Sequence, residues 1–87
     1  MNSNITERHL ETKMLIDYHD GMAVLSCPAG LPPGSRVRFE FSDDNAGVRT
    51  FHGKIVKLKR RANGAFAVSV RLHNLDKSHR EILEKLV

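Results

Sequence analysis

The 87-residue sequence has no tryptophan, a single cysteine and no long hydrophobic run. A membrane-spanning helix needs about 20 consecutive apolar residues, so an integral membrane protein is excluded. The lone Cys27 cannot form an internal disulfide, which favours a reducing compartment. The first residues also lack the basic and then apolar stretch that is typical of a secretory signal. We therefore expect a cytoplasmic protein, and the length of the chain predicts one small domain.

The sequence also lacks the patterns that accompany catalytic, metal and cofactor sites. Cys27 lies between Ser26 and Pro28 without a local nucleophile signature. None of the five histidines lies two to five residues from another, although metal ligands are usually paired at such spacings. The glycines beside the prolines do not open a helix, so they form no phosphate loop. These absences predict a protein that is not an enzyme and holds neither a metal nor a cofactor.

Acidic residues are missing between Asn45 and Leu75, whereas residues 36–75 as a whole carry nine lysines and arginines against three acids. A stretch with charges of one sign predicts an anionic partner, and an acidic protein surface is the first candidate. The alternative is a solvated hairpin that has no partner. The candidate partner-binding residues are Lys54, Lys57, Lys59, Arg60 and Arg61.

Nucleic acid is a further candidate partner, but it is unlikely because barrels that bind it usually expose aromatic side chains on which bases stack. Only Tyr18 and Phe51 are available for that role. The other phenylalanines are assigned to the predicted core: Phe39, Phe41 and Phe66.

Strict alternation of apolar and charged residues predicts a half-buried strand over residues 36–41. A second strand is predicted over residues 48–59, with a bulge where Ile55 and Val56 are adjacent near Gly53. The Asn63-Gly64 turn leads into a third strand that ends at Leu72. Two earlier strands are expected over residues 13–17 and 21–26, joined by a turn of residues 18–21.

A C-terminal helix is predicted over residues 77–87 because Ile82, Leu83, Leu86 and Val87 form one apolar stripe. Its N-cap is either Ser78, within a capping box, or Asp76. We expect the helix to pack on the alanine- and serine-rich face of the strand that ends at Leu72. Short strands followed by one helix predict a mainly β fold, a small antiparallel barrel, and periodicity alone leaves SH3-like and OB-like barrels open.

Four segments stand in a specific order along the chain: Asp17-Tyr18-His19-Asp20-Gly21-Met22-Ala23-Val24-Leu25, Leu31-Pro32-Pro33-Gly34-Ser35-Arg36-Val37-Arg38-Phe39, Phe51-His52-Gly53-Lys54-Ile55-Val56 and Gly64-Ala65-Phe66-Ala67-Val68-Ser69-Val70-Arg71-Leu72. Together with the terminal helix they resemble the PilZ domain, over about residues 15–87. The similarity implies a six-stranded barrel with a C-terminal helix and a role in bacterial cyclic di-GMP signalling. Because Arg8 lies close before Asp17, we expect the first strand of the barrel to be shortened or absent. We accordingly expect residues 1–10 to be a flexible arm and residues 11–87 to be the domain.

The family binds cyclic di-GMP through an R-x-x-x-R segment and a [D/N]-x-S-x-x-G turn. Here Arg8 is followed by Lys13, one position late and without the bidentate fork of arginine. In the turn, Asp17 and Gly21 match the ends, but His19 replaces the serine and one residue is missing. The resemblance therefore implies a degenerate member, a non-catalytic adaptor that acts through protein contacts with weak or no nucleotide binding. The alternatives are a true cyclic di-GMP receptor that uses these residues, or simply an exposed arm and a hairpin turn.

Overall fold

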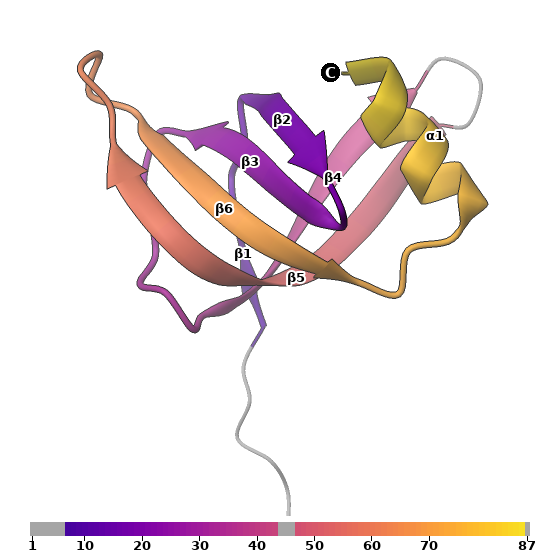
Figure 1. Cartoon of the computed structure of the whole chain (residues 1–87), viewed down its shortest axis with the longest axis horizontal. Helices are drawn as coiled ribbons and strands as arrows, with labels where there is room; N and C mark the ends of the chain where they lie inside the picture. Colours follow the sequence, from indigo (N-terminus) through magenta and orange to yellow (C-terminus); the bar gives the residue numbers. More distant parts are fainter. Residues whose placement is uncertain (1–6, 44–46, 87) are drawn as a thin grey trace, which may run out of the picture.

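The computed structural model describes residues 7–43 and 47–86, which form one six-stranded sheet and one helix (Figure 1). The strand order is β1-β4-β5-β6-β3-β2. The predicted mainly β fold with six strands and a C-terminal helix is confirmed. The elements are β1 (Arg8–His9), β2 (Met14–His19), β3 (Met22–Cys27), β4 (Arg36–Asp43), β5 (Gly47–Arg60), β6 (Phe66–His73) and α1 (Lys77–Leu86).

The sheet is curved but not closed, because β1 and β2 stand at the two ends of the strand order. The β1–β4 pair is parallel and the other pairs are antiparallel. Arg8 pairs with Val37, and Leu10 is only 3% exposed. The expectation of an arm over residues 1–10 is therefore wrong for residues 8–10, which belong to the sheet and the core. Residues 1–6 lie outside the described part of the chain.

Alternating apolar residues of β3, β4, β5 and β6 point to one side of the sheet, here called the inner face, and form the core. Phe39 on β4 and Phe51 on β5 are register partners, and their rings stack with centroids 5.4 Å apart. Phe41 packs its ring edge against both of them. This aromatic cluster joins the two strands and leaves the charged residues between its members on the opposite, outer face.

The predicted bulge in β5 is confirmed at Val56. Ile55 pairs with Val70, but the next paired residue is Lys57, opposite Ser69. Val56 is thus the extra residue, and its side chain is 42% exposed. Beyond the bulge Leu58 again lies opposite Val68 of the core, so the alternation of β5 is restored.

At Gly53 the strands β5 and β6 lie so close together that a side chain does not fit. A Cβ atom at this position would lie 2.5 Å from Cγ1 of Val70 and 2.6 Å from the carbonyl oxygen of Arg71. The second contact is to backbone, which cannot rotate away. Any residue other than glycine at this position would therefore force β6 to shift.

The β2–β3 hairpin turns on Asp20 and Gly21, whose φ angles of 52° and 77° are those of a type I′ turn. The Asp-Gly pair is a preferred sequence for this turn because both positions need positive φ. The Leu72 amide donates a hydrogen bond of 2.9 Å to the carbonyl oxygen of Gly21. This bond fixes the tip of the hairpin beside the end of β6.

Helix α1 covers the inner face of the sheet, where it contacts β2 and β4 (Figure 1). Ile82 and Leu83 are buried in the core, and the His79 ring lies edge-on to Phe51 at 4.9 Å. The expectation that the helix packs on the small side chains of β6 is wrong, because those side chains belong to the outer face. Within residues 7–43 and 47–86, no helix has the length and apolar character that crossing a membrane requires.

The N-cap of α1 is Asp76, so the second of the two N-cap alternatives is confirmed. Its Oδ1 accepts hydrogen bonds from the His79 amide at 3.0 Å and from Ser78 Oγ at 2.8 Å. His79 Nε2 in turn donates to the Thr50 carbonyl oxygen at 2.9 Å, which fastens the first turn of the helix to β5. These bonds to the carboxylate hold the pKa of Asp76 well below its ordinary value.

Gly53→Ala should destabilise the protein by about 1–3 kcal/mol, as overpacking of a well-packed interior usually does. The added methyl group would push against the backbone of β6 at Arg71. Urea unfolding followed by circular dichroism measures the change. An unchanged midpoint would show that β5 and β6 are not in this close contact.

Asp76→Ala should destabilise the protein at neutral pH because the first helical amides lose their acceptor. The folded-state pKa is lowered, so the carboxylate contributes stability above the ordinary carboxyl pKa of ~3.9 and loses it as the pH falls toward the folded-state pKa. Urea unfolding should therefore show a gap between wild type and variant that is wide at about pH 7 and narrower at about pH 3. Glu84→Ala removes an exposed carboxylate from the same helix and is the matched control. A gap of equal size at both pH values would contradict the N-cap role.

Candidate functional site

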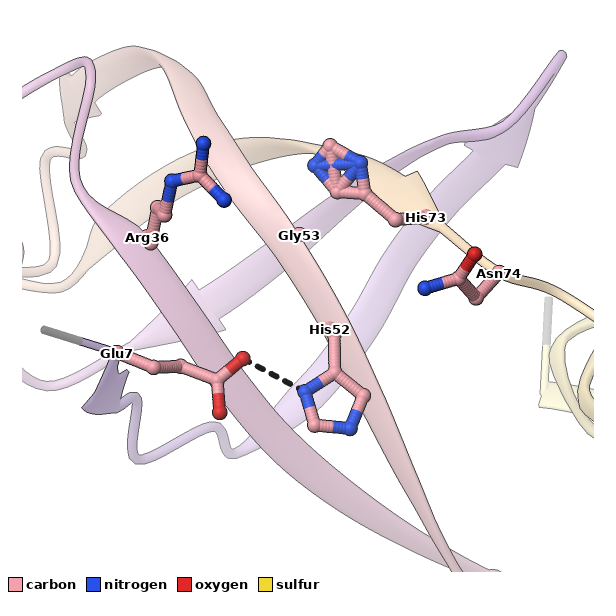
Figure 2. Close-up of a pocket in the computed structure, with 6 residues that line it drawn as sticks. All are labelled: Glu7, Arg36, His52, Gly53, His73 and Asn74. Carbon is pink, nitrogen blue, oxygen red and sulfur yellow. Dashed lines mark hydrogen bonds and ion pairs between the residues drawn. The ribbon is translucent and has the colours of Figure 1, made fainter. Parts of the chain in front are cut away.

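A pocket of about 470 Å³ opens on the outer face where three central strands meet the segment before β1 (Figure 2). Its volume lies within the range of ~300–1,000 Å³ that is typical of small-molecule sites. The pocket takes residues from the start of β4, the middle of β5 and the end of β6. The lining residues are Glu7, Arg36, His52, Gly53, His73 and Asn74.

Glu7 is the acidic member of this pocket, and its carboxylate is already engaged. His52 Nδ1 donates to Glu7 Oε2 at 2.6 Å, and Arg38 Nη1 lies 4.0 Å from Glu7 Oε1 (Figure 2 shows the first contact). A second pair, His9 Nε2 with Glu40 Oε1 at 2.8 Å, joins β1 to β4. These half-exposed pairs are worth little each, but together they fasten the segment around β1 to the outer face.

Six basic side chains form two rows across β4, β5 and β6 on this outer face. In the first row Arg36 pairs with Lys54, and Lys54 pairs with Arg71. In the second row Arg38 pairs with His52, and His52 pairs with His73. We call this set the basic grid: Arg36, Arg38, His52, Lys54, Arg71 and His73.

Like charges directly opposite one another in a sheet repel and destabilise the pairing. Among the described residues, Glu7 is the acid that reaches the grid, and it pairs with the second row. The first row, Arg36, Lys54 and Arg71, has no ion-pair partner within that part of the chain. The arrangement can hold an anion by charge and by guanidinium hydrogen bonds.

The residues that the resemblance assigned to nucleotide binding lie on different elements. Arg8 lies on β1, whereas Asp17 and His19 lie on β2, the next strand in the chain. Gly21 occupies the β2–β3 turn, and His19 pairs with the neighbouring Asp20 at 3.1 Å in a highly exposed position. Lys13 precedes β2 and uses its amide to bond the Ser26 carbonyl oxygen.

Arg8 lines a second, smaller pocket of about 160 Å³ beside the β3–β4 connection. This pocket does not include the other four residues of the predicted nucleotide site. Its lining residues are Arg8, His9, Leu10, Glu11, Pro28, Ala29, Gly30 and Leu31.

The predicted partner-binding residues are exposed on β5 and its turn into β6. Lys57 and Lys59 lie opposite Ser69 and Ala67, so both point from the outer face. Arg60 lies opposite Phe66, and Arg61 begins the turn by donating its amide to Ala65. We call Lys54, Lys57, Lys59, Arg60 and Arg61 the docking strip.

Other candidate groups are buried or partly buried. Phe51 is 1% exposed and offers no face for stacking a base, whereas Tyr18 is partly buried and packs against the core. Cys27 is fully buried, and burial raises the pKa of its thiol to about 11, which keeps it protonated at neutral pH. In residues 7–43 and 47–86, no three histidine, cysteine or acidic side chains gather as metal ligands.

The basic grid was not found by sequence analysis, although each strand carried part of the signal. Alternation placed Arg36 and Arg38 on one face of their strand, and Arg71 and His73 on one face of theirs. The sequence does not reveal the strand register, which places these residues beside His52 and Lys54. Glu7 was missed because no structure was expected for residues 1–10.

Comparisons with known proteins identify the family. The PilZ domain matches residues 4–87, which is nearly the whole chain. Comparison with curated proteins and with solved structures gives no match. The match includes the six-stranded sheet and the terminal helix described above, and it connects the chain with cyclic di-GMP signalling. This chain belongs to the PilZ domain family.

Proposed function

We propose that the protein is a non-catalytic adaptor of the cyclic di-GMP pathway in the bacterial cytoplasm. It acts through contacts with an acidic protein partner and has weak or no binding of cyclic di-GMP through its family motif positions. The partner docks on the docking strip. The observation that carries this proposal is a run of exposed cations along β5 with no ion-pair partner among the described residues.

The geometry of the strip supports contact with a protein rather than with a small ligand. Lys57 and Lys59 follow the bulge at Val56 and project from the outer face, while Arg60 and Arg61 continue the charge into the turn. The apolar side chain of Val56 lies exposed among them. Charged side chains around an exposed apolar residue are typical of a protein interface, in which opposite charges steer the approach of the partner.

The altered motifs support the second half of the proposal. Gripping a phosphodiester with a bidentate fork needs arginine, and Lys13 offers a single ammonium group instead. Arg8 lines a pocket that does not include the other four motif positions. The receptor alternative would need these side chains to converge on one ligand. The nucleic-acid alternative has little support from aromatic stacking, because Phe51 is buried and Tyr18 is partly buried against the core.

Lys57→Glu combined with Lys59→Glu should abolish partner binding, because it reverses two charges of the docking strip that project from the same outer face. Cross-linking in the bacterial host followed by mass spectrometry identifies the partner, and titration of the purified pair measures its affinity. Wild-type affinity should also fall as salt is raised, since screening weakens contacts between exposed charges.

Lys77→Glu combined with Arg80→Glu is the matched control, because it makes the same change of net charge on helix α1. This control should bind the partner with nearly wild-type affinity, and both variants should keep the wild-type circular dichroism spectrum. Equal affinity of the strip variant and the wild type would overturn the proposal.

A further inference from the structure

The first row of the basic grid places three cations side by side, without an acidic partner among the described residues. Arg36, Lys54 and Arg71 are direct register partners on adjacent strands. Neighbouring strands are about 4.8 Å apart, so the backbones of the outer two residues lie about 10 Å apart with the lysine between them. Such a row costs stability in the free protein. A bound anion would remove this cost.

We propose that the first row of the basic grid and the pocket beside it bind a terminal phosphate or diphosphate group of a small ligand. A terminal phosphate carries a charge of about −1.5 to −2 and three acceptor oxygens, which suit a row of three adjacent cations. A phosphodiester carries one charge and fits the row less well. This site and the docking strip share Lys54.

The pocket supplies the cavity and the further polar groups that the row of cations lacks. Arg36 belongs to both, and His73 and Asn74 from the end of β6 add ring nitrogens and a side-chain amide on the opposite wall (Figure 2). Its volume of about 470 Å³ leaves room for the remainder of a ligand whose phosphate lies on the row. Small-molecule sites of this kind combine a cavity with a few polar groups that fix orientation.

Glu7 acts at this site as an internal competitor. Its carboxylate lies on the second row, with His52 Nδ1 at 2.6 Å and Arg38 Nη1 at 4.0 Å. There it pairs with two of the three residues of the second row and places a negative charge at the wall of the pocket. Removal of this charge should therefore strengthen the binding of a phosphate.

The test is a titration of the full chain with inorganic pyrophosphate and with GDP, followed by ¹⁵N NMR at about physiological salt. We expect the amide signals of residues 36, 54 and 71 to shift, with a dissociation constant on the order of a millimolar or tighter. Equal affinity for the two probes would mean that the diphosphate is the whole ligand. Tighter binding of GDP would mean that the pocket also holds the nucleoside.

Arg36→Gln combined with Arg71→Gln should weaken binding about tenfold or more, because each lost fork removes hydrogen bonds to a charged group. Lys57→Gln combined with Lys59→Gln removes the same charge from the same face of the sheet outside the grid, and should leave the affinity nearly unchanged. Glu7→Gln should bind a few-fold more tightly.

Thermal unfolding gives a second readout that a merely structural role would not produce. Without ligand, Lys54→Gln should raise the melting temperature by relieving repulsion, whereas Lys57→Gln, opposite Ser69, should not. Any of three results would overturn the proposal. The first is that neither probe shifts the amide signals, and the second is that the arginine double variant and the lysine double variant weaken binding equally. The third is that the protein binds cyclic di-GMP but not pyrophosphate.

Discussion

The close approach of β5 and β6 at Gly53 is the constraint on which the outer face depends. At this point a methyl group would collide with the backbone of Arg71, so the two strands can lie this close only with glycine. The pairs on either side of Gly53 are His52 with His73 and Lys54 with Arg71. Core packing on the inner face thus fixes the spacing of charges on the outer face.

The bulge at Val56 then divides β5 into two functional stretches. Before the bulge, β5 is paired on both sides, by β4 and β6, and its outward residues belong to the basic grid and its pocket. After it, β5 pairs with β6 alone, and its cations form the docking strip together with Lys54. The two proposed surfaces therefore meet on one strand, and a ligand on the grid would lie next to a partner on the strip. Our proposals thus assign two uses to the basic charge of residues 36–75.

Sequence alone predicted the strands, the bulge and the terminal helix, because each depends on local alternation or on turn chemistry. The Val37, Phe39 and Phe41 alternation and the apolar doublet at Ile55 are examples. It did not predict β1, since a two-residue strand carries no periodicity, or the face that the helix covers. It singled out the residues of the proposed docking strip, because these cations are neighbours in the sequence. It missed the grid, whose rows exist only once β4, β5 and β6 are in register.

The central claim is that this PilZ domain acts through protein contacts and that its altered motif positions no longer form a nucleotide site. Isothermal titration of the purified protein with cyclic di-GMP at physiological salt tests the nucleotide half of that claim most directly. The account predicts no saturable heat at about a hundred micromolar ligand, well above the micromolar affinity of a functional receptor. Saturable micromolar binding that Arg8→Ala removes would contradict it and would make the protein a cyclic di-GMP receptor.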